Sequence, residues 1–423
     1  MINIAVLGLG SRGNGYMTIA KLFCKNRAKV VALCDILPDR LAQCAKKFKV
    51  DADKCFTSDE EFFAAGKLAD AIFICTQDRD HYAHAVKAIE LGYHILCEKP
   101  LSPSVEECAD LVRRVEEKGV RMLVCHVLRY SEYYNKIKQI IDSGVIGEVV
   151  GINHTENIGY YHYAHSYVRG NWRDSNTTSP MIMAKTCHDM DLIHWYMGGG
   201  CETISSFGFL KHFKEENAPE GSTARCLDGC KAKERCPFDA ERLYLTDPLY
   251  RATFLRFRGR TLTNKDNPTK EDKYEALRTG GYGRCVYRSD NNVCDHQVVN
   301  MRFSGDRVAT LTVSAFTKGC FRNTHIMGTR GEIICKDSRN KLTLKIFRDG
   351  VKKVRAKIIP FPFHLGGDVG IVKDFVNMLE GKPTILKDLT TVDVTYFSHK
   401  MAMAAEYSRL HNGESVDFKS FKG

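Results

Sequence analysis

Two stretches of this 423-residue chain carry side chains that can move a proton. In "CEKP", Lys99 follows an apolar run and stands beside Glu98. In "SPMIMAKTCHDMDLIHW", Lys185, His188 and Asp189 gather where an apolar run turns into a helical pattern. Lysine and histidine can act as general acid and base near neutral pH. We therefore predict Lys99 and His188 as catalytic residues, with Lys185 as a third candidate; a surface lysine and a helix-capping histidine are the structural alternatives.

A second group of side chains lies in "GYYHYAHSYVRGNWR", residues 159–173, which is crowded with aromatic rings. The stretch has no clean period of two or 3.6 residues, so it is not expected to be a core element. Aromatic faces with hydrogen-bonding tips suit a sugar, and an aromatic interface loop is the alternative. The predicted substrate-binding residues are Tyr160, His162, His165, Arg169, Trp172 and Arg173 of this stretch, together with Arg129, Tyr130 and Asp189.

The third group is made of cysteines. "CLDGCKAKERCPF" places three of them within eleven positions, and a fourth is Cys285 in "GYGRCVY", or alternatively Cys294 in "NNVCDHQ". Four thiolates would make a closed structural zinc site, with an iron–sulfur cluster as the second choice and unliganded cysteines as the remaining alternative. The predicted zinc ligands are Cys226, Cys230, Cys236 and Cys285.

The elements that must position these groups begin with a nucleotide-binding pattern. "INIAVL" predicts a strand, "GLGSRG" has the spacing G-x-G-x-x-G, and a helical pattern and a second strand follow, ending at Asp35. These parts in register predict a dinucleotide fold, in which Asp35 accepts hydrogen bonds from the ribose and disfavours a 2′-phosphate. NAD is therefore favoured over NADP, although Arg40 weakens that preference. The predicted cofactor contacts are Gly8, Gly10, Ser11, Arg12, Gly13, Asp35, Arg40, Thr76, His81, Glu98 and Lys99.

Strands and helices alternate up to about residue 125, which predicts a doubly wound parallel sheet whose ligands bind at the carboxyl ends of its strands. Later runs such as "HQVVNMRFS" and "RVATLTVSAF" alternate in polarity and are typical of an antiparallel sheet. We expect an α/β chain: a Rossmann domain at 1–125, then an α+β substrate and oligomerisation domain at 126–423 with a large, mostly antiparallel open sheet. A cysteine-rich insertion at about 209–295, which zinc would stabilise, and C-terminal helices complete it.

Composition narrows the class of protein. Hydrophobic and charged contents of 43% and 27% are typical of a globular protein. The net charge of +11 is spread among acidic residues rather than gathered in a stripe, which argues against nucleic acid as a partner. No stretch approaches the roughly twenty apolar residues of a membrane span, and the N-terminus lacks a secretory signal pattern.

The cysteines and the second sheet predict where the protein works and how it assembles. Most of the seventeen cysteines stand singly in apolar segments, which favours a reducing cytoplasm over a disulfide-bonded, secreted protein. The alternating apolar residues of the second sheet need cover on the outer face, and helices supply only part of it. We therefore expect a homodimer or homotetramer that pairs these sheets.

Together these residues resemble the glucose–fructose oxidoreductase/inositol dehydrogenase family, Gfo/Idh/MocA. The motifs that carry the resemblance are "GLGSRG", "CEKP" at 97–100, "RY" at 129–130, "HDMDLIHW" at 188–195, "GTRGEI" at 328–333 and "HLGGD" at 364–368. The resemblance implies an enzyme of carbohydrate metabolism that uses NAD or NADP to move a hydride to or from a secondary hydroxyl of a sugar, glycoside or cyclitol. It places Lys99 between nicotinamide and substrate and makes His188 the proton acceptor.

The chain departs from the family pattern at one position. Many members have an aspartate four residues before the histidine, whereas this chain has Ala184 there, with Lys185 as the nearest polar substitute. Two alternatives to a simple dehydrogenase stay open. One is an NAD-dependent glycosidase that oxidises, eliminates, hydrates and reduces again; the other is a non-enzymatic NAD-binding sensor, against which the Lys99 and His188 pair argues.

Overall fold

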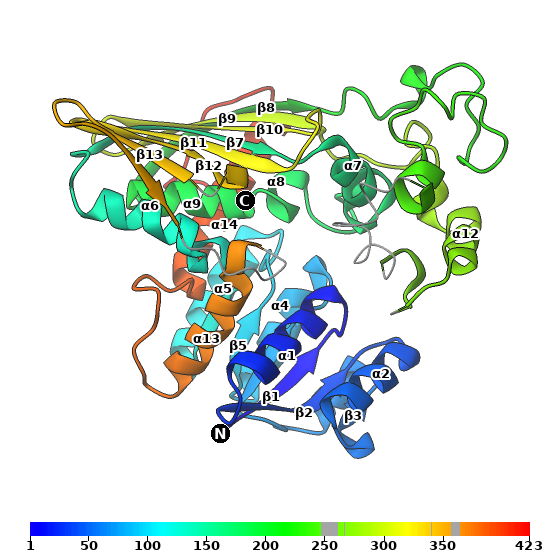
Figure 1. Ribbon diagram of the computed structural model, residues 1–423. Helices are drawn as coiled ribbons and strands as arrows, with labels where there is room; N and C mark the ends of the chain where they lie inside the picture. The colour runs from blue at the N-terminus through cyan, green and yellow to red at the C-terminus, as the bar shows by residue number, and fades with distance from the viewer. Residues whose placement is uncertain (247–260, 266, 340, 357–363) are drawn as a thin grey trace.

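The computed structural model describes residues 1–423 apart from 247–260, 266, 340 and 357–363 (Figure 1). Its first sheet has six parallel strands in the order β3-β2-β1-β4-β5-β6. This order is that of a doubly wound dinucleotide fold, so the predicted Rossmann sheet is confirmed. The strands are β1 (Ile2–Leu7), β2 (Ala28–Cys34), β3 (Cys55–Phe56), β4 (Ala71–Ile74), β5 (His94–Cys97) and β6 (Met122–Val124).

Five helices connect these strands and cover the sheet: α1 (Ser11–Phe23), α2 (Pro38–Phe48), α3 (Asp59–Ala64), α4 (His81–Glu90) and α5 (Val105–Lys118). Helix α5 begins where the Ser104 hydroxyl accepts a hydrogen bond from the Glu107 backbone N–H, and it ends at Gly119, which has a left-handed conformation. The strands are almost completely buried, as expected of a parallel sheet covered on both faces.

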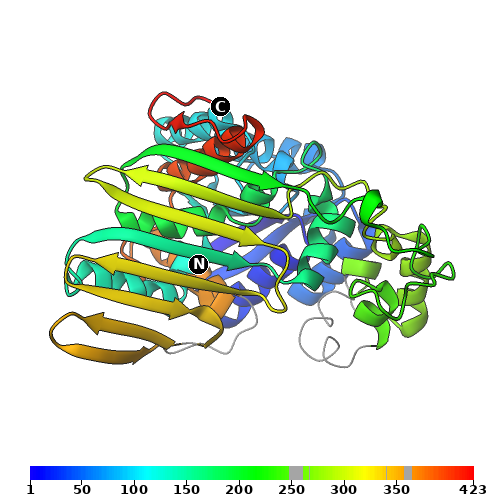
Figure 2. The same cartoon turned by 90° about the horizontal axis from the view of Figure 1, so that it is seen from above.

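The second sheet has nine strands in the order β14-β13-β12-β11-β7-β10-β9-β8-β15. The strands are β7 (Val149–Asn157), β8 (Cys201–Phe209), β9 (His296–Phe303), β10 (Arg307–Ser314), β11 (Phe321–Gly328), β12 (Gly331–Lys336), β13 (Lys341–Ile346), β14 (Gly350–Arg355) and β15 (Val416–Asp417). The pair β7 and β10 is parallel and the other neighbours run antiparallel, so the prediction of a mostly antiparallel sheet is confirmed. Figure 2 looks onto the face of this sheet that is turned away from the helices.

Helices α6 (Glu132–Asp142), α8 (Met181–Ala184), α9 (Cys187–Met197) and α14 (Val392–Leu410) lie between the large sheet and the Rossmann domain (Figure 1). Helix α13 (Gly367–Leu379) lies beside α1 and packs on the Rossmann sheet, where Phe375 meets Phe73 of β4 with ring centroids 5.9 Å apart. The C-terminal part returns to the Rossmann domain: Arg27 forms an ion pair with Glu380 at 2.6 Å, and the Thr390 hydroxyl donates to the backbone carbonyl of Val124 at 2.6 Å. These contacts fix the C-terminal part of the chain to the Rossmann domain.

The aromatic stretch 159–173 is more regular and more buried than expected. It forms α7 (Tyr160–Tyr163), a π-helical segment (Ala164–Arg169) and a 3₁₀ turn (Asn171–Arg173). Tyr163 and Val168 are fully buried, so the prediction that this stretch is not a core element is wrong. A π-helical segment widens the turn and breaks the 3.6-residue period, which explains why the periodicity failed to reveal it.

The segment between the end of β8 and the start of β9 belongs to neither sheet in its described part. It lies beyond one end of the large sheet, at the right of Figures 1 and 2, and contains α12 (Lys270–Thr279). A small apolar cluster stabilises it, made of Cys226, Ala240, Leu243, Tyr244, Leu245, Leu262 and Leu277. The segment thus has a modest core, although its sequence offered few apolar runs.

Candidate active site

The glycine turn between β1 and α1 fits a dinucleotide. Gly8 has a φ of +87°, and a Cβ there would lie 2.5 Å from the backbone oxygen of Cys75. A Cβ on Gly13 would lie 2.0 Å from the backbone oxygen of Gly8, whereas one on Gly10 would meet nothing within 4 Å. Packing therefore requires glycine at 8 and 13, while Gly10 leaves open space at the helix N-terminus, where free N–H groups attract a pyrophosphate.

Asp35 lies where expected, at the end of β2, and it is almost fully buried. Its carboxylate accepts hydrogen bonds from the backbone N–H groups of Leu9 at 2.7 Å and Leu37 at 2.9 Å. Arg40 lies 3.3 Å from the same carboxylate. The carboxylate thus fixes the glycine turn to the second strand, and Arg40 offsets part of the charge on which the preference for NAD depends.

Other predicted cofactor residues lie around the same edge of the sheet. Ser11 is the exposed first residue of α1, and the Thr76 hydroxyl pairs with His84 Nδ1 at 3.0 Å. His81 lies 2.6 Å from the carbonyl oxygen of Pro100 and 3.3 Å from that of Thr76. His81 therefore joins the end of β4 to the "CEKP" turn, and its ring nitrogens are already engaged by protein.

Arg12 ties three of the sequence motifs together. Its guanidinium lies 2.6 Å from a Glu98 oxygen in "CEKP" and 2.6 Å from an Asp368 oxygen in "HLGGD". The Tyr16 hydroxyl donates to Glu98 at 2.6 Å. Burial by itself would raise the pKa of Glu98, but Arg12 and Lys99 outweigh it and hold that pKa below its ordinary value. The glycine turn is thereby held against an ionised Glu98.

The predicted catalytic pair is brought together from the two domains. Lys99, which follows β5, donates to the backbone carbonyl of Ala184 at the end of α8, one turn before His188. His188 is 5% exposed, and its Nδ1 is buried without a partner among the described residues. Burial lowers the pKa of His188 well below its ordinary value, and the positive charge of Lys99 lowers it further. A neutral imidazole beside an ammonium group can accept a proton from a hydroxyl.

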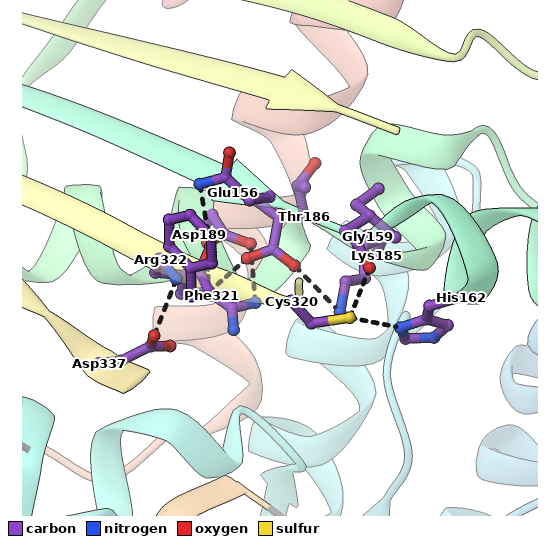
Figure 3. Close-up of polar contacts among 12 residues, drawn as sticks. Glu156, Gly159, His162, Lys185, Thr186, Asp189, Cys320, Phe321, Arg322 and Asp337 are labelled. Carbon is purple, nitrogen blue, oxygen red and sulfur yellow. Dashed lines mark hydrogen bonds and ion pairs between the residues drawn. The ribbon is translucent and has the colours of Figure 1, made fainter. Parts of the chain in front are cut away.

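Lys185 and Asp189 belong to a buried ionic network (Figure 3). Lys185 lies 3.1 Å from Glu156 of β7, and Arg322 of β11 lies 3.1 Å from Glu156 and 2.6 Å from Asp189. Asp189 is fully buried and also pairs with His154 Nε2 at 2.7 Å. Asp189 thus anchors the start of α9 to the large sheet, and the structure does not place it as a substrate contact.

Sequence reasoning missed the partners in this network. Glu156 and Arg322 are charged residues on strands β7 and β11, and both side chains point into the protein. In the sequence, each of them is a charged residue close to one end of a strand, and this position is the signal that could have indicated a buried ion pair. The pairing itself depends on which strands are neighbours, and one sequence does not reveal that.

Arg129 and Tyr130, which were predicted to bind substrate, are instead occupied by contacts within the protein. Arg129 is 1% exposed, pairs with Asp191 at 2.6 Å and lies 5.1 Å from the ring centroid of Trp195. The Tyr130 hydroxyl bonds to Thr390 at 2.9 Å. Both side chains are committed to holding α9 and the C-terminal segment, so the predicted substrate contacts at these positions differ from what the structure shows.

The polar residues of the aromatic stretch reach mainly toward the insertion and the first domain. His165 Nδ1 lies 2.8 Å from the Tyr244 hydroxyl, and Arg173 pairs with Asp290 at 2.8 Å. The indole N–H of Trp172 donates to Asp78 at 3.1 Å. These contacts dock the stretch between the neighbouring segments, which is the role of an interface rather than of a freely exposed sugar platform.

Tyr160 and His162 belong to α7, and His162 lies beside the network of Figure 3. His162 Nδ1 lies 3.7 Å from Cys320 Sγ, just before β11 (Figure 3). Tyr160 packs edge-on against Phe238, with ring centroids 5.9 Å apart. Both side chains are only partly buried, so the prediction that they contact the substrate still stands as a prediction.

The four predicted zinc ligands, Cys226, Cys230, Cys236 and Cys285, line one small cavity. Cys294, the alternative fourth ligand, does not line this cavity, and its thiol donates to Gln297. Nevertheless, no group of three His, Cys, Asp or Glu side chains among the described residues is placed to hold a metal ion. The predicted zinc ion, or iron–sulfur cluster, is therefore not supported.

The surroundings of these cysteines explain how they are accommodated. Burial raises the pKa of the Cys236 and Cys285 thiols, which favours their neutral form. Arg169, which was predicted to bind substrate, instead reaches this cavity: its guanidinium donates to the carbonyl of Phe238 at 2.8 Å and to Cys226 Sγ at 3.4 Å. Arg169 thus joins the aromatic stretch to the cavity that the four cysteines line.

Three comparisons place the chain among known proteins. The family model GFO_IDH_MocA, described as "Oxidoreductase family, NAD-binding Rossmann fold", matches residues 2–126, and the family's model for the C-terminal alpha/beta domain matches residues 138–359. The oxidoreductase YteT of Bacillus subtilis (strain 168) is 25% identical over 79% of this chain and 76% of its own length. A search of the described helices finds none with the length and apolarity to cross a membrane.

Other similarities are more distant or cover less. The 2,7-anhydro-N-acetylneuraminate hydratase of Escherichia coli (strain K12) is 26% identical over 49% of this chain, and the match spans about half, 53%, of the hydratase. Levoglucosan dehydrogenase, in complex with NADH and levoglucosan, superposes with a TM-score of 0.69 at 17% identity over 99% of both chains. At that identity the superposition establishes the shared fold.

The nucleotide fold, the glycine turn and the matched family models define an NAD-binding oxidoreductase. The chain belongs to the Gfo/Idh/MocA family, as its motifs suggested.

Proposed function

We propose that this protein is an NAD-dependent dehydrogenase that oxidises a secondary hydroxyl of a sugar, glycoside or cyclitol. The observation that carries the proposal is the position of His188: a buried imidazole with a lowered pKa, next to Lys99, at the ligand edge of the nucleotide-binding sheet. A neutral base and a cation at this edge suit the removal of a proton from a hydroxyl whose carbon loses a hydride.

In the proposed reaction the substrate hydroxyl lies between Lys99 and His188. The ammonium group of Lys99 donates to the hydroxyl oxygen and stabilises the negative charge that develops there. His188 Nε2 takes the hydroxyl proton, because burial keeps this imidazole neutral. Bound NAD⁺ would supply the hydride acceptor, held by the glycine turn and Asp35.

Substrate specificity is proposed to come from the partly buried polar residues beside this pair. Lys185 keeps 19% of its side chain exposed while it pairs with Glu156, so it can also donate to a substrate hydroxyl. His162 and Tyr160 would supply further hydrogen bonds and an aromatic face. The match with a dehydrogenase named for the sugar levoglucosan agrees with a carbohydrate substrate, although that likeness is one of fold.

A redox-neutral reaction is the second candidate, because one relative is named a hydratase. Such an enzyme, like the glycosidases of this family, would release product without accumulating NADH. A panel of sugars, cyclitols and aryl glycosides should be incubated with NAD⁺, and NADH absorbance and aglycone release recorded together. The proposal expects NADH in proportion to product; product or aglycone released without NADH would favour the second candidate.

We propose that NAD is preferred over NADP, because the Asp35 carboxylate would repel a 2′-phosphate. Arg40 lies beside it and reduces the expected margin. Isothermal titration with NAD⁺ and NADP⁺ tests the preference, and tighter binding of NADP⁺ would contradict it.

The absence of any paired cysteine among the described residues agrees with the proposed cytoplasmic setting.

We propose that a second copy of the chain covers the outer face of the large sheet. Val150, Phe207, Val298, Val308 and Ile334 point outward from five strands of this sheet and are 38–56% exposed. An apolar face of this kind is normally covered by another protein surface. Sedimentation at micromolar concentration should show a dimer or tetramer, and a monomer throughout would contradict the proposal.

A further inference from the structure

We propose that His126 is the positioning residue of the active site: its imidazole accepts the Nδ1–H of His188 and so fixes the tautomer in which Nε2 of His188 takes the substrate proton. The proposal rests on the proposed function, because it gives His188 the role of base. It assigns the residue that orients that base.

His126 follows β6 directly, at the ligand edge of the Rossmann sheet, and is completely buried. Neither of its ring nitrogens has a hydrogen-bond partner among the described residues. A buried polar group without a partner destabilises the fold, and native proteins hold few of them. An imidazole with both nitrogens unpaired therefore points to a partner that it meets in the working state of the enzyme.

His188, whose ring lies next to that of His126, also has a buried ring nitrogen without a hydrogen-bond partner. Its Nδ1 is also buried and unpaired, and the two ring centroids are 5.5 Å apart with planes at 82°. A ring nitrogen lies about 1.2 Å from its ring centroid, so two nitrogens that faced each other across this distance would be about 3 Å apart, which is a hydrogen-bond distance. Small rotations of the two rings would pair Nδ1 of His188 with one of the two unpaired nitrogens of His126.

His126 has a second histidine neighbour, but that one is already satisfied. The ring of His399 lies 5.4 Å from His126, yet its Nε2 accepts from the backbone N–H of Leu101 at 3.0 Å and its Nδ1 lies 3.2 Å from the carbonyl of Thr395. His399 therefore holds a fixed tautomer with no nitrogen to offer. Among the described rings of this cluster, His126 and His188 are the ones that hold unpaired buried nitrogens.

The charged neighbours of both rings are committed elsewhere. Around His126 they are Arg129, paired with Asp191; Lys99, bonded to Ala184; and Glu98, paired with Arg12. Around His188 they are Lys99, His364, which pairs with Asp368, and Arg322, which pairs with Asp189. His364 is the other candidate acceptor for Nδ1 of His188: it bonds to Asp368 through its own Nδ1, and its ring centroid lies 5.8 Å from that of His188, against 5.5 Å for the fully buried His126. A histidine base needs such an acceptor, since the bond made by one ring nitrogen sets the protonation of the other.

The tautomer follows from this geometry. If Nδ1 of His188 carries the hydrogen that His126 accepts, Nε2 carries the lone pair. Nδ1 of His188 is enclosed, whereas Nε2 is not among the enclosed, unpaired atoms, so Nε2 is the nitrogen that a substrate can reach. Substrate oxidation would then break the hydroxyl O–H bond, form Nε2–H, and leave an imidazolium whose Nδ1–H still donates to His126.

The first test measures the tautomer directly. Wild-type protein and His126→Phe, both loaded with NAD⁺ and labelled with ¹⁵N at histidine, should be compared by long-range ¹H–¹⁵N correlation, with His188→Gln assigning the signals. Phenylalanine keeps the ring packing against His188 and His399 but removes both nitrogens. We expect His188 to hold the Nδ1–H tautomer in the wild type and a mixture in the variant. An Nε2–H tautomer in the wild type, or no change in the variant, would overturn the proposal.

The second test is kinetic and uses the best substrate from the sugar and cyclitol panel. His126→Phe should lower kcat about ten- to a hundredfold with KM and NAD⁺ affinity within about twofold of wild type, because binding groups are untouched. His126→Gln, which keeps an acceptor, should recover part of kcat and serves as the alternative if the Phe variant does not fold. Full kcat with an unchanged pH profile in both variants would refute a positioning role.

The two hypotheses fail in different ways. If His188→Gln retained normal turnover, the proposed function would be wrong whatever His126 does. If His188→Gln were inactive while His126→Phe behaved as wild type in both tests, the function would stand and the assignment of His126 would be wrong. The melting temperature provides the folding control. Replacing His126 by Phe leaves the Nδ1–H of His188 without its acceptor, so a modest decrease is expected, and the kinetic comparison is made below the melting temperature of both proteins.

Discussion

Replacing His188 with glutamine tests the proposed chemistry most sharply. Glutamine keeps a polar side chain of similar reach but cannot take up a proton. Loss of a positioned base typically costs a hundred- to ten-thousandfold in rate. Lys99 would remain to polarise the hydroxyl, so we expect the lower part of that range, about a hundred- to a thousandfold in kcat, or roughly 3–4 kcal/mol of barrier. Cofactor affinity should not change, because the glycine turn and Asp35 make no contact with His188.

The assay is NADH formation under saturating NAD⁺, with NAD⁺ affinity measured separately by titration. His194→Gln is the matched control: His194 lies on the same helix α9, is half-buried, and stacks on Phe397 with ring centroids 5.8 Å apart. The control should keep near-normal kcat. Equal rates for His188→Gln and His194→Gln would refute the role of His188 as base.

The pH profile of the wild type should reflect the environment of His188. Burial, followed by Lys99 and the neighbouring histidines, lowers its pKa well below the ordinary value. The base must be deprotonated for oxidation, so a lower pKa moves the acid limb to lower pH, and kcat/KM should stay constant down through about pH 6.5. An acid limb centred at or above that pH would show that the imidazole is not shielded as the structure indicates.

Three further substitutions follow from the same structure. Lys99→Met should lower kcat by about a hundredfold or more while the protein remains folded; normal turnover would remove Lys99 from the mechanism. Gly13→Ala should impair folding, because its Cβ would meet the Gly8 backbone oxygen at 2.0 Å, whereas Gly10→Ala should fold and lose NAD⁺ affinity; circular dichroism and titration separate the two. Arg129→Met should lower stability in urea by about 3–5 kcal/mol, because it leaves Asp191 charged and buried; a change under 1 kcal/mol would contradict this.

Acid should destabilise the fold through its buried histidines. Burial lowers the pKa of His126 and His188 well below the ordinary value, and that of His194 to about 4. In the unfolded chain these groups take up protons below about pH 6.5, whereas in the folded protein they stay neutral, so stability falls as pH drops through that value. The melting temperature should therefore decrease from pH 7 to pH 5. A melting temperature that rose over this range would contradict the assigned burial.

The sequence predicted those features that depend on local pattern. Glycine spacing and the alternation of strands and helices identified the Rossmann sheet, because each of these signals spans only a few residues. The gathering of four cysteines around one cavity could also be expected from their spacing. What these thiols meet there could not, since Arg169 reaches them from the aromatic stretch and burial keeps two of them neutral.

Features that depend on which segments become neighbours in the fold could not be predicted from the sequence. Asp189 looked like a substrate contact beside His188, but Arg322 from a strand 133 positions away holds it in the interior. Arg129 was likewise expected at the substrate and is buried against Asp191. His126 is not among the residues predicted from the sequence, because its unpaired nitrogens and its approach to His188 exist only in three dimensions.

The central claim is that this chain transfers a hydride from a secondary alcohol to NAD⁺ with His188 as the base. The most direct measurement is NADH formation from the panel of sugars and cyclitols by the wild type and by His188→Gln. We predict stoichiometric NADH with at least one member of the panel and a loss of about a hundredfold or more in the variant. Panel turnover without NADH, or NADH formation that the variant leaves unchanged, would contradict the claim.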